Sequence, residues 1–350
     1  MLQGRATPQG TAQFEAQSGS APGHFRAAPG GLRLSSLGIG TYLGRDDAQT
    51  DALYADAVRR ALQLGINVID TAINYRNQRS ERAVGAALRE SGLPRDQVVV
   101  CTKGGYLPFD GGRPADVRAY FEETFLRPGI LSAGEIVAGC HSLAPRYLAD
   151  QIERSRRNLG VACIDVYYLH NPETQLGEVP RAAFQRRLGA AFEELERACA
   201  DGRIAAYGAA TWSCLRLEPE AEEYLSLAEL LEAARAAGGA GHHFRAVQLP
   251  FNVEMDEAAT SRNQGGRTLL EAAREAGLAV FSSASVLQGQ LAQQLAQPVR
   301  DACPGLATDA QRALQFARST PGVTCALVGM KTRAHVEDNA ALAKVAPLAV

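Results

Sequence analysis

The chain has 350 residues, of which 46% are hydrophobic, and its 36 basic residues nearly balance its 38 acidic ones. This length and composition can bury the core of one large domain or of two small ones. Near-neutrality excludes a strong global field that would recruit nucleic acid or an anionic membrane surface. No apolar run approaches the roughly 20 residues that span a bilayer, and seven cysteines without Cys-x-x-Cys spacing indicate reduced thiols in a cytoplasmic protein.

The N-terminal stretch differs in composition from the remainder of the chain. Residues 1–30 are rich in Gly, Ala, Pro, Gln and Ser and lack the apolar block of a signal peptide. We expect these residues to form a flexible tail and residues 31–350 to form a single domain. A small hairpin beyond Gly31 is expected to feed a first buried strand at 37–42.

From that strand onward, short β-branched runs alternate with apolar residues at helical spacing. The further strands are expected at 67–70, 98–102, 164–169, 204–208, 246–249, 279–282 and 323–328. The helices are expected at 47–64, 80–91, 145–159, 181–200, 225–237, 268–276, 309–319 and 333–344.

Parallel strands need helical crossovers, and eight such units close into a barrel without edges. A doubly wound open sheet also alternates strands and helices, but Gly38-x-Gly40 lacks the third glycine of its nucleotide-binding turn. We therefore predict an α/β fold, a (β/α)8 TIM barrel with an N-terminal hairpin. Residues 104–144 interrupt the alternation after strand 3, and we expect them to form a long, partly helical loop excursion near the active-site face.

Four ionisable residues stand at or just beyond the carboxyl ends of three neighbouring strands, where TIM barrels carry their catalytic groups. Asp70 ends the second strand, Lys103 the third and His170 the fourth, while Tyr75 follows in the loop after Asp70. Each residue taken alone has an ordinary structural explanation, such as a helix cap, a solvated lysine or a core aromatic. Their coincidence at equivalent positions predicts one catalytic site.

The chemistry of these groups is coherent. A phenol has a pKa of about 10, which is too high for an efficient proton donor near neutrality. A nearby ammonium lowers the pKa of the phenol, a carboxylate offsets the cost of burying that ammonium, and a histidine can donate a hydrogen bond that orients a carbonyl oxygen. The four residues predict a site that gives a proton to an oxygen gaining negative charge.

At these residues the sequence resembles the aldo-keto reductase family. The motifs are Asp70-Thr-Ala-x-x-Tyr75 followed by Glu81, Thr102-Lys103, and Asp165-x-Tyr-x-x-His170-x-Pro172, and the resemblance extends from about Gly31 to Ala343. It implies a (β/α)8 barrel that binds NADPH, less often NADH, and transfers hydride between the nicotinamide and a carbonyl carbon. It also implies that Tyr75 is the general acid/base, that Lys103 and Asp70 tune it, and that His170 orients the substrate carbonyl.

The resemblance further implies a set of cofactor-binding positions around the nicotinamide. Phe281 would stack on the nicotinamide ring, Gln248 would bind its carboxamide, and Ala210-Thr211 replaces the Ser-Asn that the family usually has. The remaining positions of this set are Gly40, Thr41, Tyr42, Asp70 and Ser282.

The segment from Gly329 to Asn339 resembles the adenosine-binding end of the family. Asp338 and Asn339 match residues that hold the adenine. Lys331, Thr332 and Arg333 are candidates for the 2′-phosphate site, although His335 stands where the family often has Arg. The cationic groups favour NADP, with NAD as a possible cofactor.

Tyr106 and Trp212 are candidate walls of a substrate pocket, and the expected partner is a small-molecule carbonyl or alcohol. The neighbouring His242 and His243 cannot both easily face one ion, so we expect no metal site. Neither nucleic acid nor a membrane is an expected partner, and we expect a monomer or a weak homo-oligomer.

Two other functions stay open at this point. Lys103 at a barrel strand end could form a Schiff base, as in a lyase, although that chemistry does not need the Tyr75 phenol. The family also includes channel-associated subunits that hold NADP and turn over slowly, so a regulatory binding module is the second alternative.

Overall fold

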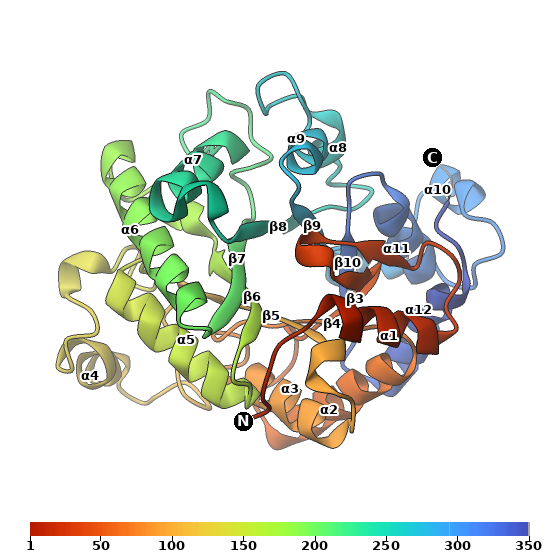
Figure 1. Ribbon diagram of the computed structural model, residues 1–350, viewed down its shortest axis with the longest axis horizontal. Helices are drawn as coiled ribbons and strands as arrows, with labels where there is room; N and C mark the ends of the chain where they lie inside the picture. The colour runs from red at the N-terminus through yellow and green to blue at the C-terminus, as the bar shows by residue number, and fades with distance from the viewer. Residues whose placement is uncertain (294, 349–350) are drawn as a thin grey trace.

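The structure is a computed structural model that describes residues 1–293 and 295–348. Eight parallel strands close into a barrel in the order β10-β3-β4-β5-β6-β7-β8-β9, and helices surround them (Figure 1). The predicted (β/α)8 barrel is therefore confirmed. Its strands are β3 (Leu37–Gly40), β4 (Val68–Asp70), β5 (Val99–Gly104), β6 (Ile164–His170), β7 (Ile204–Ala210), β8 (Phe244–Pro250), β9 (Ala279–Ser283) and β10 (Cys325–Gly329).

The expected helices are present, with ends that differ from the prediction by a few residues. The cap of the second helix follows from its sequence, because Asp47 accepts a hydrogen bond from the Thr50 N–H at 2.7 Å. Two short helices in loops, α8 and α10, were not predicted. The helices are α1 (Pro8–Ser18), α2 (Ala48–Gln63), α3 (Arg79–Glu90), α4 (Val117–Phe121), α5 (Pro145–Leu159), α6 (Arg181–Ala200), α7 (Leu227–Gly238), α8 (Glu257–Thr260), α9 (Leu269–Glu275), α10 (Gln297–Ala302), α11 (Asp309–Ser319) and α12 (Arg333–Ala340).

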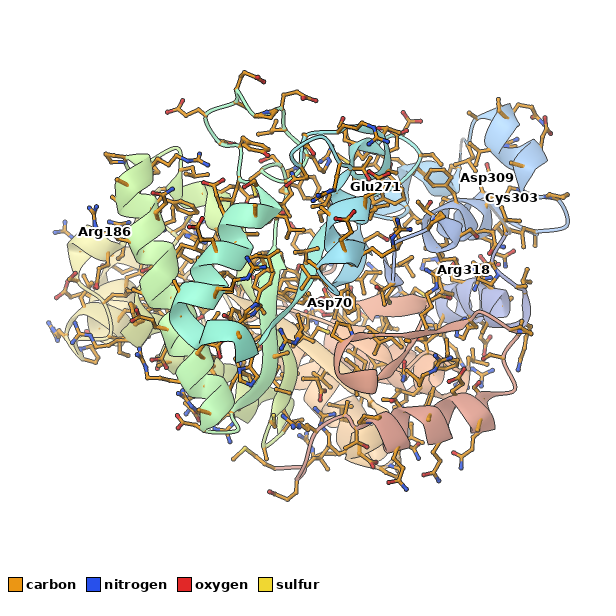
Figure 2. The ribbon with its side chains drawn as sticks, turned by 45° about the horizontal axis from the view of Figure 1, so that its top comes forward. Asp70, Arg186, Glu271, Cys303, Asp309 and Arg318 are labelled. Atoms are coloured by element: carbon orange, nitrogen blue, oxygen red, sulfur yellow. The ribbon has the colours of Figure 1, made fainter. Side chains whose placement is uncertain are left out.

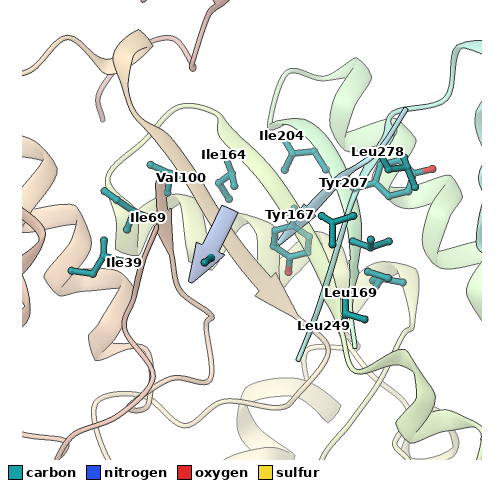
Figure 3. Packing of buried hydrophobic residues seen from close by; sticks show 14 of the residues in the cluster. Ile39, Ile69, Val100, Ile164, Tyr167, Leu169, Ile204, Tyr207, Leu249 and Leu278 are labelled. Carbon is teal, nitrogen blue, oxygen red and sulfur yellow. The ribbon is translucent and has the colours of Figure 1, made fainter. Parts of the chain in front are cut away.

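Successive residues of each strand face opposite sides of the barrel wall. Ile69 and Val100 face outward and pack in the layer between strands and helices (Figure 3). Val68 and Cys101 face inward and belong to a separate cluster that fills the barrel. Because both faces are buried, the strands are predominantly apolar, with buried polar exceptions such as Asp165 and Thr102.

The N-terminal segment is built into the fold, so the expectation of a flexible tail is wrong. It contains α1 and strand β1 (Phe25–Ala27), which pairs antiparallel with β2 (Arg33–Ser35). Ala6 packs with the cluster inside the barrel, at the amino ends of the strands. The small residues that suggested disorder instead permit close packing, since the backbone at Asp96 leaves no room for a side chain at Gly10.

The insertion 104–144 is partly helical, as expected. Helix α4 continues into a π-helical turn at Glu122–Leu126, and Leu107, Phe125 and Leu131 form a small core of their own with Tyr147 of α5. In Figures 1 and 2 this part of the insertion lies at the outer edge of the molecule, beside α5 and α6. The ends of the insertion, rather than its middle, therefore approach the barrel mouth.

Candidate active site

A cavity of about 820 Å³ opens at the carboxyl ends of the barrel strands. Its walls are formed by strand ends, by the loops after β3, β4, β7 and β9, and by the start of α12. Among the residues predicted for the site, those that line this cavity are Gly40, Thr41, Tyr42, Asp70, Tyr75, Tyr106, His170, Ala210, Thr211, Trp212, Gln248, Gly329, Lys331, His335, Asp338 and Asn339.

An ion pair lies at the floor of the cavity. Lys103 Nζ donates to Asp70 Oδ2 at 2.5 Å and to the Thr71 carbonyl at 2.9 Å, and both charged side chains are buried. Gln248 Nε2 donates to the other carboxylate oxygen of Asp70 at 2.8 Å. Burial by itself would lower the pKa of Lys103, but the Asp70 carboxylate, with Tyr75 as a further cause, outweighs burial and the pKa is raised. Lys103 is therefore an ammonium at neutral pH.

Tyr75 stands over this ion pair. Lys103 Nζ lies 4.9 Å from the centroid of the Tyr75 ring. Burial raises the pKa of Tyr75 and the Lys103 ammonium opposes that rise without cancelling it. The sequence argument anticipated the lowering effect of the ammonium but not the larger effect of desolvation. In the free protein Tyr75 is consequently a phenol that holds its proton at neutral pH.

His170 lies on the other side of Tyr75. Its ring lies 5.8 Å from that of Tyr75 and 5.1 Å from that of Tyr106, in edge-to-face arrangements. Burial, with Lys103 as a second cause, lowers the pKa of His170 well below its usual value. A neutral imidazole carries one N–H group, which can donate a hydrogen bond to an oxygen.

A second histidine, His141, supports His170 and was not predicted to do so. Arg187 Nη1 donates to Gln175 Oε1 at 2.7 Å, which orients the Gln175 amide so that its Nε2 donates to His141 Nδ1 at 2.9 Å. The proton of His141 therefore lies on Nε2, which donates to the His170 carbonyl at 2.8 Å. Gly105 permits this contact, because a Cβ there would lie 2.8 Å from His141 Nε2.

The turn after Tyr75 is also specialised. Arg76, Asn77 and Gln78 have φ values of 48°, 54° and 70°, a left-handed conformation that is costly for residues other than glycine. The buried Arg76 guanidinium stabilises the turn by donating to the Arg45 carbonyl at 2.7 Å and to Asp51 Oδ1 at 2.6 Å. The turn thus connects the segment of Tyr75 to the loop after β3, through Arg45, and to the first turn of α2, through Asp51. These two partners are 31 and 25 positions from Arg76.

Three predicted cofactor positions do not face the cavity. Phe281 packs inside the barrel against Tyr168, with ring centroids 6.1 Å apart, because β9 continues two residues further and places Ser283 at the rim. Ser282 points to the opposite side of the strand and is fully buried beside Ser285. The stacking role expected of Phe281 is therefore wrong.

Thr332 is the third of these positions. Its hydroxyl caps α12 by accepting from the His335 N–H at 3.4 Å, and Arg333 nearby pairs with Glu337. Exposed Lys331 and His335 line this end of the cavity. Asn339 is buried there, and its Oδ1 has no hydrogen-bond partner within the part of the chain that the structure describes.

Within residues 1–293 and 295–348, no helix combines the length and apolarity needed to cross a membrane. Over the same residues, no group of three or more His, Cys, Asp or Glu side chains is arranged to hold a metal ion.

Comparison with solved structures supports the fold. An aldo/keto reductase from Klebsiella pneumoniae, solved in complex with NADP and acetate, superposes with a TM-score of 0.62 at 21% identity over 92% of this chain and 90% of that one. The holo form of an aldo-keto reductase from Bacillus halodurans gives a TM-score of 0.65 at 19% identity, covering 93% and 92%.

Curated relatives match at comparable or shorter length. A putative voltage-gated potassium channel subunit beta from Schizosaccharomyces pombe is 24% identical over 88% of this chain and 84% of its own. The NADH-specific methylglyoxal reductase of Escherichia coli is 30% identical, but the match spans 57% of this chain and 54% of that protein. A 9,11-endoperoxide prostaglandin H2 reductase from Trypanosoma cruzi is 33% identical over 40% of this chain and 35% of its own. A model of the family described as "Aldo/keto reductase family" matches residues 36–349, and the chain therefore belongs to the aldo/keto reductase family.

Proposed function

We propose that this protein is an NAD(P)H-dependent oxidoreductase that interconverts a carbonyl compound and an alcohol, with Tyr75 as the general acid/base. The observation that carries the proposal is the Tyr75 phenol placed over the buried Asp70–Lys103 ion pair, in the wall of a cavity that His170 also lines. A carbonyl oxygen that gains negative charge would receive the Tyr75 proton, and the Lys103 ammonium would stabilise the phenolate left behind.

Neutral His170 complements Tyr75 in this role. Its buried Nδ1 has no hydrogen-bond partner among the residues that the structure describes, and the residue lines the cavity, so we propose that the ring contacts a substrate oxygen there. Because His141 holds the His170 backbone, the imidazole is positioned before substrate arrives, and little reorganisation is needed during the reaction.

The residues around the cavity fit a dinucleotide. Gln248 and Thr211 lie near Tyr75 in the wall, Gly40 leaves the wall open, and Asn339 offers an unpartnered buried oxygen at the far end. When bound, the reduced nicotinamide supplies the hydride. We propose NADP as the preferred cofactor, because Lys331 places positive charge at the proposed adenosine end, and because the Klebsiella relative was solved with NADP. NAD is the alternative cofactor, because the Escherichia coli relative is named as an NADH-specific reductase.

The charge state of Lys103 bears on the lyase alternative. Schiff-base chemistry needs a neutral amine, whereas Asp70 raises the pKa of Lys103 and holds its Nζ at 2.5 Å. The ion pair therefore supports a tuning role for Lys103 over a nucleophilic one.

The test is a pair of titrations followed by a turnover assay. We expect NADPH to bind more tightly than NADH, and an aldehyde or ketone to oxidise the bound NADPH in repeated turnovers. Binding of nucleotide without turnover across a panel of aldehydes, ketones and sugars would instead favour a regulatory module of the channel-subunit kind. Borohydride trapping of a carbonyl substrate on Lys103 without nucleotide would favour the lyase.

A further inference from the structure

A single helical turn directly after His170 connects several walls of the cavity. This 3₁₀ turn, Pro172–Gln175, directs three side chains to three different neighbours. The Thr174 hydroxyl lies 3.2 Å from that of Tyr106, and Gln175 orients His141, which in turn holds the His170 backbone. The turn therefore joins the strand that carries His170 to the end of the insertion.

Glu173 makes the third connection, across to the loop after β7. Its Oε1 accepts the backbone N–H of Trp212 at 2.5 Å and that of Ser213 at 3.1 Å. These groups are 39 and 40 positions away in the sequence. One carboxylate oxygen thus holds two consecutive backbone groups at the point where the chain leaves the sheet.

The burial of Glu173 is unusual because no cation accompanies it. The residue is 5% exposed, and across residues 1–293 and 295–348 no basic side chain forms an ion pair with it and its Oε2 has no hydrogen-bond partner. Burial raises the pKa of Glu173, and the backbone N–H groups of Trp212, Glu173 and Ser213, together with the Cys214 thiol, partly oppose the rise. A lone buried carboxylate is costly, so packing alone does not account for an acid at this position, whereas its backbone hydrogen bonds do.

The Glu173 clamp consists of the two hydrogen bonds from the Trp212 and Ser213 N–H groups to Glu173 Oε1. It lies directly at the backbone of Trp212. Trp212 is the only tryptophan in the chain, it is 46% exposed, and it lines the cavity. The residue before it, Thr211, is still held by the sheet, since its N–H donates to the Gln248 carbonyl at 2.8 Å. At Trp212 that pattern ends, and Glu173 provides the acceptor for the next two N–H groups.

We propose that Glu173 is a positioning residue that holds Trp212 as a wall of the substrate end of the cavity, and thereby determines how tightly carbonyl substrates bind. Glu173 touches neither the reacting atoms nor the nucleotide site, and it acts through the Trp212 backbone. The catalytic consequence rests on the proposed function, while the positioning itself can be measured without any substrate.

The first experiment uses the intrinsic fluorescence of Trp212 in the free protein. We compare the wild type with Glu173→Ala and Glu173→Gln, and with Glu178→Gln as a control, because Glu178 is an exposed acid on the same loop. We expect lower fluorescence anisotropy and a shifted emission maximum in Glu173→Ala, a smaller change in Glu173→Gln, whose amide oxygen can still accept, and no change in the control. Wild-type anisotropy and emission in folded Glu173→Ala would overturn the proposal.

The second experiment separates substrate binding from chemistry. With a carbonyl substrate that the wild type reduces, Glu173→Gln should raise KM about fivefold or more while kcat and NADPH affinity stay within about twofold. In a Trp212→Ala background, Glu173→Gln should add little further change to KM, since the effect is transmitted through Trp212. An equal rise of KM in both backgrounds would overturn the proposal. This double-mutant comparison uses Glu173→Gln, so it tests the proposal even if Glu173→Ala does not fold.

The two proposals fail in different ways. If the wild type reduces no carbonyl compound, the proposed function fails while the fluorescence comparison still tests the clamp. If carbonyl reduction is observed but Trp212 is insensitive to Glu173, the clamp fails and the proposed function stands.

Discussion

The barrel carries a buried ion pair at each end, and the two pairs differ in what surrounds them. At the amino end, Arg95 Nη2 lies 2.6 Å from Asp165 Oδ2. At the carboxyl end, Lys103 Nζ lies 2.5 Å from Asp70 Oδ2. All four side chains are at most 6% exposed, so burial and geometry do not distinguish a structural pair from a chemical one.

The neighbours of the two carboxylates do distinguish them. Asp165 also accepts the N–H groups of Ala6 at 2.6 Å and Val100 at 2.7 Å, and the N-terminal segment covers the pair. Asp70 accepts one further bond, from Gln248, and its partner Lys103 lies beneath Tyr75, which lines an open cavity. The same pairing is therefore sealed inside the fold at the amino end and lies beside an open cavity at the carboxyl end, where we propose that it tunes Tyr75.

The largest expected effect comes from breaking the amino-end pair. Arg95→Met leaves the Asp165 carboxylate buried without its cation, and we expect a loss of about 3–5 kcal/mol in the free energy of unfolding. Urea denaturation measures this loss. The folded variant should keep kcat within about twofold, because Arg95 is remote from the cavity. The control is Arg186→Met, which removes an exposed arginine of α6 on the outer surface (Figure 2) and should change stability by less than about 0.5 kcal/mol.

The second prediction concerns Tyr75, the proposed proton donor above the carboxyl-end pair. Tyr75→Phe removes the hydroxyl and should lower kcat by about 10²-fold or more, while nucleotide affinity and the urea midpoint stay near those of the wild type. Steady-state kinetics and a fluorescence titration test both parts. Wild-type turnover in this variant would contradict the assignment of Tyr75.

The third prediction compares two buried histidines. His24, in the N-terminal segment, bonds the Gly65 carbonyl at 3.0 Å, and His141 supports the site. Burial lowers the pKa of each to about 4 from an ordinary value of 6.5. Between these values the unfolded chain binds the protons and the folded chain does not, so stability is complete above pH 6.5 and declines as pH falls toward 4, by up to about 3 kcal/mol per histidine.

Urea unfolding between pH 7 and pH 4 measures this decline. The slope of the unfolding free energy against pH reports how many protons the chain takes up when it unfolds. His24→Gln and His141→Gln should each lower that number by up to one in this pH interval. Unchanged slopes in both variants would show that neither histidine is the source. A change for one alone would tell which end of the barrel is sensitive to acid.

The smallest expected effect on activity concerns the proposed tuning of Tyr75 by Lys103. Lys103→Met removes the ammonium that opposes the desolvation of Tyr75, so the pKa of the phenol should rise further. We expect about a tenfold loss in kcat for carbonyl reduction and a shift of the alkaline limb of the pH–rate profile to higher pH, since Tyr75 must be protonated to act as the acid. An unchanged profile would argue against the tuning role of Lys103.

Much of the fold could be predicted because it depends on local sequence patterns. The same is true of the grouping of Asp70, Tyr75, Lys103 and His170. Strands buried on both faces are predominantly apolar, so Asp70, Lys103 and His170 stand out near their carboxyl ends. Since alternate residues point inward, the three side chains could be assigned to the barrel rim before their neighbours were known. The role of Phe281 was inferred from the family resemblance and not from the strand pattern, and the structure instead packs its side chain into the cluster inside the barrel.

The residue pattern alone was enough to predict the alternation of strands and helices, the barrel, and the acid, lysine, phenol and imidazole at neighbouring strand ends. The three-dimensional structure was needed to show that Ala6 packs at the amino end, that His141 bonds the His170 carbonyl, and that Glu173 accepts the Trp212 N–H. These contacts join residues 159, 29 and 39 positions apart. Local periodicity reports which face of an element is buried, but the partner of a buried polar group depends on where distant segments meet.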